Sequence, residues 1–499
     1  MPRTSPATAP IVTLLAIAYG TAHAQPIQIG SRLELFLDDY LIEQFEGGAR
    51  LRLHHPVRKE IALEHDAPWE GRGSGYHTVF RDGERFRLYY KSWNMPEVTG
   101  KAGGLVIAYA ESRDGIRWTK PDLGLVEYNG SRKNNIILDK VNGNEPHDFS
   151  PFIDPKPGTA GDARYKAVGF GRTPRGLYAF KSADGLHWTL MKPTPIITQG
   201  AFDTQNIAFW DPNIRKYRCY LRDFDANKQR GIRTSVSDDF LTWSKPEWIV
   251  FPNTPVEQLY VNQVLPYYRA PHILIGFPAR YVDRGWTESA KLLPELADRE
   301  ERAKKNTRYG TTVTDSLIMS SRDGRTFHRW DQAFLRPGLR TRYNWSYGDN
   351  YIAWHVIETE PTNDDEPREL SLFATEGYFT GDSSRLRRYT MRIDGFASAF
   401  APLGGGTIVS KPVVFDGNQL VVNFSTAAGG SIRLALEDAA GKPIDGYTMN
   451  EATEIFGDAL ERTVSWKGGS DVGKVAGKPV RIRVALKDAD LFSFRFVRK

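Results

Sequence analysis

Four copies of one short pattern decide the fold: SRDGIRW (112–118), SADGLHW (182–188), SDDFLTW (237–243) and SRDGRTF (321–327). Each reads Ser-x-Asp-Gly-x-x-aromatic, except that Asp239-Phe240 replaces Asp-Gly in the third copy. The aromatic residues are 70, 55 and 84 positions apart, which suits a unit of several strands better than a short solenoid repeat. Asp-Gly between strand-like segments is typical of a tight hairpin, because glycine accepts a positive φ. We therefore interpret the pattern as a turn, not as an active site.

Strand-like segments flank each copy of this turn. LVIAYAE, GLYAFK, GIRTSV and SLIMS precede the four copies, and another hairpin lies upstream of each, as in TVFRDGERFRLYY (78–90). A fifth unit without the marker covers 349–393, with RRYTMRI as its expected fourth strand. Four-stranded units repeated radially are the blades of a β-propeller. The sequence therefore predicts an all-β chain with a five-bladed β-propeller over residues 25–400.

Two segments depart from the repeat. Residues 287–306 are polar with a helical pattern, which predicts an exposed helical insertion inside the fourth unit. Beyond a glycine-rich linker at 404–407, short alternating strands follow, including PVVFDGNQLVVNF and PVRIRVAL. We expect residues 401–499 to form a C-terminal β-sandwich.

The N-terminus and the composition indicate where such a chain works. Residues 1–24 combine Arg3, an apolar run at 11–20 and a small-residue cleavage site, so they resemble a secretory signal. We expect an exported, periplasmic or extracellular protein with no integral membrane segment. Cys219 is the only cysteine, which excludes an internal disulfide. The net charge of +6 is scattered, so a nucleic-acid partner is not expected, and the oligomeric state stays open.

Acidic residues lie where the first strand of each unit begins. The inner strands of a propeller surround a central channel, so such side chains converge on one mouth. A pair of carboxyl groups, one protonated and one ionised, is what glycoside hydrolysis requires, and crowding separates their pKa values. Two of the acids precede the tryptophan of their own unit by 40 positions. The candidate catalytic residues are Asp148, Asp203 and Glu257, with Glu70 and Asp349 in reserve.

Other side chains near these acids suit a carbohydrate ligand. Aromatic rings can pack on sugar faces, and polar groups can bind hydroxyls or an anion. The expected substrate-binding residues are Trp69, His77, Arg222, Tyr260, Asn262 and Trp345, and Tyr76 and Tyr347 are further aromatic candidates. No zinc motif and no close histidine pair occurs, so we predict no metal and no cofactor, with a structural calcium ion held by aspartates as an open alternative.

Taken together, these features resemble the five-bladed propeller glycoside hydrolases of families 32, 43 and 68. The order of propeller and sandwich is most similar to family 32, and LFLDDYLIE (35–43), NWSYGDNY (344–351) and LRRYTMRIDGF (386–396) resemble poorly characterised bacterial relatives. The resemblance implies an aspartate nucleophile or base, a stabilising aspartate and a glutamic acid as proton donor. We assign these roles to Asp148, Asp203 and Glu257 respectively. The family's W-M-N-D-P-N-G stretch is missing, and Asp38 and Asp39 precede the first unit.

Two alternatives remain open at this point. A non-catalytic carbohydrate-binding propeller would share the aromatic residues but would not need converging acids. A sialidase-like hydrolase would need several arginines and a tyrosine in the channel, for which Arg222, Arg280 and Tyr281 are the candidates. The sequence does not identify the sugar or the linkage.

Overall fold

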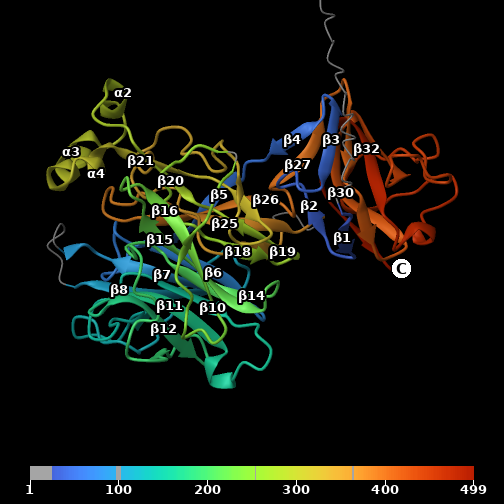
Figure 1. The fold of residues 1–499 in the computed structure, drawn as a ribbon. Coiled ribbons are helices and arrows are strands. Elements are labelled where there is room, and N and C mark those ends of the chain that lie inside the picture. Colours follow the sequence, from blue (N-terminus) through green and yellow to red (C-terminus); the bar gives the residue numbers. More distant parts are fainter. Residues whose placement is uncertain (1–24, 97–102, 253, 362–364) are drawn as a thin grey trace, which may run out of the picture.

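The computed structural model describes residues 25–96, 103–252, 254–361 and 365–499 (Figure 1). The predicted secretory signal at 1–24 lies outside these residues. The chain is all-β, with five four-stranded sheets, a two-stranded sheet and one ten-stranded sheet. The five four-stranded sheets are the blades of a propeller, which confirms the predicted fold class. No helix in the described part of the chain is both long and apolar enough to span a membrane.

The first three blades are consecutive antiparallel sheets, and the S-x-D-G-x-x-aromatic turn follows the third strand of each. Their strands are β6 (Gly75–Asp82), β7 (Arg85–Trp93), β8 (Leu105–Ser112) and β9 (Ile136–Leu138) in blade 1; β10 (Phe149–Ile153), β11 (Tyr165–Arg172), β12 (Arg175–Ser182) and β13 (Thr189–Leu190) in blade 2; and β14 (Ile207–Asp211), β15 (Lys216–Phe224), β16 (Arg230–Ser237) and β17 (Glu247–Trp248) in blade 3.

The fourth and fifth blades depart from this simple order. Blade 4 contains β18 (Leu265–Tyr267), β19 (Ala270–Gly276), β22 (Met319–Ser321) and β23 (His328–Arg329). Blade 5 contains β24 (Ile357–Thr359), β25 (Glu369–Glu376), β26 (Arg385–Arg392) and β5 (Val57–Glu64). The expectation that RRYTMRI forms the fourth strand of this blade is wrong, because that segment is its third strand, β26. The fourth strand is β5, which comes from the N-terminal part of the chain and closes the ring.

Each repeated turn is held by its serine and aspartate. In the second copy, Ser182 Oγ accepts hydrogen bonds from the backbone N–H groups of Asp184 (3.3 Å) and Gly185 (2.9 Å). The carboxylate of Asp184 accepts from the N–H groups of Leu186 and His187, both at 2.9 Å. Gly185 has a φ of 78°, the left-handed conformation that the pattern predicts. The motif is therefore a structural turn.

The third copy forms the same turn without glycine. Phe240 has a φ of 69°, which is costly for a bulky side chain. Its ring is fully buried and packs against Phe152, Tyr217 and Trp243. Burial of an aromatic side chain contributes roughly 2–3 kcal/mol, which offsets the backbone cost of about 1–3 kcal/mol.

Polar and aromatic side chains fill the centre of the propeller. Gln205 donates to the carbonyl of His77 (3.2 Å), and Gln263 donates to Gln205 Oε1 (2.8 Å). Trp354 is fully buried and its indole N–H donates to the carbonyl of Val264 (2.9 Å). These residues come from the inner edges of different blades and are at most 1% exposed. The central channel is therefore closed by a floor of packed side chains.

A hairpin with helices extends from blade 4. It consists of β20 (Ala279–Asp283) and β21 (Thr312–Ser316), with α2 (Glu288–Lys291), α3 (Leu296–Lys305) and α4 (Arg308–Thr311) between them. Helices α2 and α3 lie within 287–306, where the sequence predicts a helical insertion, and α4 follows directly after it. They project from the propeller on the side away from the C-terminal strands (Figure 1). Residues of α3 and α4 line the cavities described below.

The ten-stranded sheet forms a β-sandwich beside the propeller, around one hydrophobic core. Its strands are β1 (Ile27–Gly30), β2 (Glu34–Leu35), β3 (Ile42–Gly47), β4 (Arg50–Leu53), β27 (Ala397–Ala401), β28 (Gly406–Ser410), β29 (Val413–Phe415), β30 (Gln419–Asp438), β31 (Asp458–Thr463) and β32 (Val480–Val497). Strands β1–β4 were expected within the propeller at 25–400, but they pair with the C-terminal strands. Their short apolar segments complete the sandwich core, a long-range pairing that no local pattern reveals.

Candidate functional site

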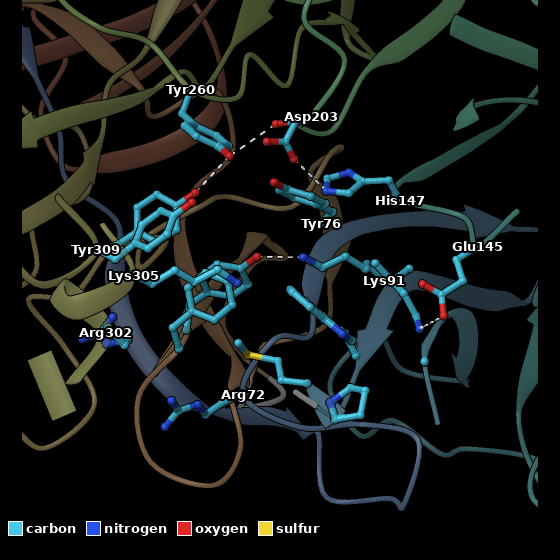
Figure 2. Close-up of a pocket in the computed structure, with 18 of the residues that line it drawn as sticks. Arg72, Tyr76, Lys91, Glu145, His147, Asp203, Tyr260, Arg302, Lys305 and Tyr309 are labelled. Atoms are coloured by element: carbon cyan, nitrogen blue, oxygen red, sulfur yellow. Dashed lines mark hydrogen bonds and ion pairs between the residues drawn. The ribbon is translucent and has the colours of Figure 1, made fainter. Parts of the chain in front are cut away.

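A cavity of about 920 Å³ opens at one mouth of the propeller (Figure 2). Strands β6 and β7 contribute to its lining, as do the segments before β10 and β14, and helix α3 forms part of one wall. We call it the main cavity. The lining residues used below are Arg72, Tyr76, Lys91, Trp93, Met95, Glu145, His147, Arg172, Asp203, Tyr260, Glu301, Arg302, Lys304, Lys305, Tyr309, Tyr347, Tyr378 and Phe379.

Asp203 is the predicted acid that lines the main cavity. Its side chain is 65% exposed, and its Oδ1 lies 2.7 Å from Nε2 of His147. Burial acts to raise the pKa of Asp203, but the hydrogen bond and charge of His147, with Arg222 and Lys91 nearby, outweigh it and lower the pKa. Burial also lowers the pKa of His147. A neutral imidazole that donates to an ionised carboxylate is the arrangement that both shifts favour.

Lys91 places a buried amine in the same cavity. The residue is 2% exposed, and Nζ donates to the phenol oxygen of Tyr378 at 2.7 Å. Nζ also lies over the rings of Tyr76 (4.5 Å), Tyr378 (5.0 Å) and Trp93 (5.4 Å). Burial lowers the pKa of Lys91 to about 7. None of the ion pairs among the described residues includes this amine, so its closest stabilising contacts are the phenol oxygen of Tyr378 and the aromatic faces.

Tyrosine rings form much of the cavity wall. The hydroxyl of Tyr347 donates to that of Tyr260 at 2.9 Å, and the ring of Tyr260 stacks near Tyr351 and Tyr281. Burial raises the pKa values of Tyr347, Tyr351 and Tyr281. They therefore remain neutral hydrogen-bonding groups with flat apolar faces, which suits the two chemical faces of a sugar ring.

Three residues of the lining have left-handed backbones. The φ angles are 55° at Tyr76, 52° at Met95 and 56° at Phe379. Non-glycine residues in this conformation cost of order 1–3 kcal/mol each and cluster at functional sites. Their concentration around one cavity supports a functional role for it.

Basic side chains also line the main cavity, several of them from α3. Arg72 Nη1 (2.9 Å) and Arg302 Nε (3.3 Å) both pair with Asp298 of α3, and Lys304 pairs with Glu301. Burial lowers the pKa of Arg302 to about 10, which still leaves it charged at neutral pH. Lys305 adds a further exposed charge to the lining.

Asp148 and Asp349 lie outside the main cavity and are at most 1% exposed. Asp148 accepts three hydrogen bonds, from the N–H of Phe170 and from the N–H and side-chain amide of Asn206, each at 3.0 Å. Asp349 accepts from the N–H groups of Ser346 and Tyr378. Burial raises the pKa to about 7 for Asp148 and to about 8 for Asp349. Both carboxyl groups brace the backbone behind the cavity and are not placed to touch a ligand in it.

Glu70 and Glu257 also lie outside the cavity lining. Glu70 is 1% exposed and accepts hydrogen bonds from Tyr90 and from Lys120, the latter at 2.5 Å. Glu257 forms ion pairs with Arg280 (3.2 Å) and with the buried Arg329. Both carboxylate oxygens of Glu257 are engaged by guanidinium groups, and the residue lines neither cavity described here. The role of general acid that the sequence suggested therefore stays a prediction.

Replacing Glu257 with Gln is expected to lower stability and to leave any activity within about threefold. Loss of the carboxylate leaves the side chain of Arg329, which is 1% exposed, without its charged partner. Because Glu257 itself is 25% exposed, we expect a cost of about 2 kcal/mol, below the roughly 3–5 kcal/mol of a fully buried pair that is broken. Urea unfolding measures it, and Glu247→Gln, from an exposed pair with Arg325, is the matched control. A large loss of activity in a folded Glu257→Gln variant would restore the predicted acid.

Two of the predicted binding residues reach a cavity. Tyr260 lines the main cavity and a second cavity of about 180 Å³ next to it, and Arg222 lines the second. The guanidinium of Arg222 lies 4.7 Å from the ring of Tyr260, and its Nη2 is 3.9 Å from Asp203. Of the sialidase-like set, Tyr281 lines the second cavity, whereas Arg280 is paired with Asp315 and Glu257.

The other four predicted binding residues have local structural partners and lie outside both lining sets. Trp69, for example, donates its indole N–H to Asn135 at 2.8 Å. The residues concerned are Trp69, His77, Asn262 and Trp345. Aromatic or polar character near a strand start was therefore not enough to predict orientation.

Lys91, His147 and Tyr378 are the important residues that sequence reasoning missed. His147 directly precedes Asp148 in the sequence, and the side chain of His147, not that of Asp148, lines the main cavity. Lys91 follows the apolar run LYY at the end of β7, where a buried lysine is unusual. A charged residue in a segment that is otherwise expected to be buried was the one feature of the sequence that could have identified Lys91.

Replacing Lys91 with Met is expected to flatten the pH dependence of stability. The folded pKa of about 7 lies below the unfolded value of about 10.4. Between these values the unfolded chain holds a proton that the folded chain lacks, so Lys91 makes stability rise with pH by up to about 1.4 kcal/mol per unit. That contribution is lost as pH falls through 7. Urea unfolding at pH 7, 8 and 9 measures the difference between the two proteins, and identical slopes would contradict a buried, uncompensated amine.

Metal ligands are not grouped in the part of the chain that the structure describes. No set of three or more His, Cys, Asp or Glu side chains there is placed to hold a metal ion. Cys219 is a free, fully buried thiol on β15, and burial raises its pKa. The polar groups that line the main cavity are carboxylate, imidazole, amine, guanidinium and phenol groups.

Comparison with known proteins finds resemblance only among solved structures. No family model matches the chain, and neither does any curated protein. A thermostable family-43 glycoside hydrolase is 12% identical with a TM-score of 0.41, covering 66% of this chain and 93% of its own. An endo-arabinase from Bacteroides thetaiotaomicron is 9% identical with a TM-score of 0.40, covering 67% and 98%.

A third solved structure extends over more of the chain. A fructofuranosidase from Schwanniomyces occidentalis is 10% identical with a TM-score of 0.37, and the match covers 90% of this chain and 98% of that one. All three are named as glycosidases, but identities and TM-scores this low leave function to be inferred from the cavity itself. The specific likeness to family 32 stays a prediction.

Proposed function

We propose that this protein is a glycoside hydrolase that cleaves its substrate in the main cavity, with Asp203 as a catalytic carboxylate. The observation that carries the proposal is the placement of Asp203. Of the five predicted acids it alone lines the cavity, it is held ionised by His147, and it lies beside tyrosine rings that can pack on a sugar. The predicted partner is therefore a carbohydrate.

The role of Asp203 follows from its lowered pKa. A carboxylate that stays ionised at neutral pH can activate water, attack the sugar carbon, or stabilise the positive charge that develops on the ring. His147 fixes its orientation through the 2.7 Å hydrogen bond. The neutral state of His147 leaves the negative charge of the carboxylate available to the substrate.

Glu145 is the best-placed second carboxyl group. It lies on the segment between β9 and β10, lines the main cavity, and accepts a weak hydrogen bond from the N–H of Leu105 at 3.4 Å. Its side chain is exposed, so it can reach the leaving oxygen of a bound sugar and serve as the acid of a carboxylate pair.

A panel of aryl glycosides and natural glycans, incubated with the wild type, Asp203→Asn and Glu145→Gln, tests the proposal. Release of reducing sugar by the wild type, lost in Asp203→Asn, is the expected result. For Glu145→Gln we expect a low rate on natural glycans and a rate close to that of the wild type on substrates with a good leaving group, because such a group departs without being protonated. Binding of glycans without any bond cleavage would overturn the proposal and support a non-catalytic carbohydrate-binding propeller.

A β-eliminating lyase is the second candidate, favoured by the contact between Lys91 and Tyr378. An amine with a pKa of about 7 is partly neutral at physiological pH, so the neutral form of Lys91 can accept a proton. On an acidic sugar this base would remove the C5 proton, a C4–C5 double bond would form, and the C4–O bond would break. Ultraviolet absorbance of the unsaturated product distinguishes this reaction from hydrolysis, which adds water instead.

A further inference from the structure

The second cavity, of about 180 Å³, has a lining unlike that of any other part of the site. We call it the arginine chamber. It shares four residues with the main cavity, so the two are neighbours. The shared residues are Asp203, Tyr260, Tyr309 and Tyr347, and the chamber's cations are Arg175, Arg222, Arg230 and Arg308.

The charges of the arginine chamber do not balance. Its lining holds four guanidinium groups and one carboxylate, Asp203. Within the described residues, the one ion pair that these arginines form is between Arg222 and Asp203, at 3.9 Å. Arginine remains charged at any physiological pH, so the excess positive charge cannot be relieved by loss of a proton.

Burial makes this excess positive charge costly. Arg222 is 3% exposed and Arg230 is 6% exposed. Arg230 donates one hydrogen bond, to Gln258 at 2.6 Å, and its Nε has no hydrogen-bond partner among the described residues. The Nε atom of Arg308 is likewise buried without a partner there. Guanidinium groups taken out of water without counterions are destabilising, unless a ligand supplies the negative charge.

Aromatic rings set the direction in which the guanidinium groups are held. Arg230 lies over Tyr281 at 4.2 Å, and Arg222 lies over Tyr260 at 4.7 Å. Stacking of this kind fixes the plane of the guanidinium group and leaves its N–H groups free to donate to a planar or tetrahedral anion. A volume of 180 Å³ accommodates a carboxylate or sulfate group with a few waters.

We propose that the arginine chamber binds the anionic substituent, a carboxylate or a sulfate ester, of a sugar whose ring occupies the main cavity. This inference rests on the proposed function and deepens it, because it names acidic glycans as the substrate class. Asp203, which lines both cavities, would then lie beside the bond between the anionic sugar and its neighbour. Neutral glycans would lack the counterion that the chamber requires.

Isothermal titration calorimetry without turnover tests this inference, with glucuronate, glucose 6-sulfate and glucose as the probes. We expect at least one anionic probe to bind at least tenfold more tightly than glucose, since charged hydrogen bonds contribute about 1.5–3 kcal/mol each. Binding of glucuronate alone identifies carboxylated sugars, and binding of the sulfate ester alone identifies sulfated ones. Equal binding of all three probes overturns the inference.

Variants assign the binding to the chamber. Arg308→Gln, at a half-buried position, is expected to lower the affinity for the anionic probe at least tenfold and to leave the affinity for glucose unchanged. Arg308→Lys is expected to recover part of the lost affinity. Arg113→Gln removes the same charge from an exposed turn and is the matched control. Asp203→Asn is expected to tighten anion binding, because it removes the one carboxylate of the lining. Unchanged affinity in a folded Arg308→Gln variant overturns the inference.

The outcomes separate this inference from the proposed function. If neutral glycosides are cleaved in a reaction that depends on Asp203, and anionic probes are not preferred, the proposed hydrolase function stands and the proposed anion site is overturned. If an anionic probe binds in a way that depends on Arg308, and no glycan is cleaved, the proposed anion site stands and the proposed hydrolase function is overturned.

Discussion

Replacing Asp203 with Asn is expected to lower kcat on the cleaved glycoside by about 10²–10⁴-fold, the usual contribution of a positioned acid or base. Asn keeps the shape of the side chain but removes the negative charge that His147 and Arg222 stabilise. Because Asp203 pairs with His147 and with the buried Arg222, loss of its charge is also expected to lower the thermal unfolding temperature. Initial rates at saturating substrate, together with a thermal melt of the same sample, measure both effects.

Two further aspartates serve as controls for this experiment. Asp238→Asn alters an exposed carboxylate that pairs with Lys216 and is expected to keep the wild-type rate. Asp148→Asn alters a buried carboxyl group that braces the backbone of Asn206, so it is expected to affect stability more than kcat. A folded Asp203→Asn enzyme with the wild-type rate would remove Asp203 from the mechanism.

Replacing Trp354 with Ala is expected to lower the free energy of unfolding by about 3–5 kcal/mol, the range for large aromatic residues in a core. Trp354 is fully buried in the floor of the propeller, and its indole N–H donates to Val264. Its backbone N–H also donates to the carbonyl of His77, which joins blade 5 to blade 1. The truncation therefore leaves a void at the point where the blades meet.

Urea unfolding followed by circular dichroism measures the effect of the Trp354 substitution. Trp286→Ala, at a position that is 37% exposed, is the matched control and is expected to change stability by less than about 1 kcal/mol. A loss in Trp354→Ala no larger than that in the control would mean that the floor is not tightly packed.

Local patterns predicted the blades because each turn is encoded within seven residues. The side chains of Ser182 and Asp184 bond to groups within the same turn, so their role is visible in the sequence. The partners of β1–β5 are instead hundreds of residues away, as in the pairing of Glu64 with Arg385. No periodicity within a short window contains that information, and β1–β4 were therefore expected in the propeller instead of the sandwich.

The candidate site was predicted less well, for a geometric reason. Asp148 and Asp203 share the same distance to their tryptophans, but Asp148 immediately precedes β10, whereas Asp203 lies four residues before β14. This difference buries one side chain behind the strands and lets the other reach the cavity. Orientation of that kind depends on how a segment enters its strand, which residue type alone does not determine. Lys91 was missed because its aromatic cage comes from three separate segments.

Closure of the ring by β5 has a consequence for the order of folding during synthesis. Arg388 of β26 donates to Glu60 of β5 across 328 positions of sequence. At a synthesis rate of about 5–20 residues per second, β5 waits roughly 15–65 s before its partner strand exists. During that time its edge is an unpaired template for other strands, a known aggregation hazard. Four of the eight residues of β5 are charged: Arg58, Lys59, Glu60 and Glu64. These charges oppose association of the unpaired strand with other chains until β26 has been synthesised.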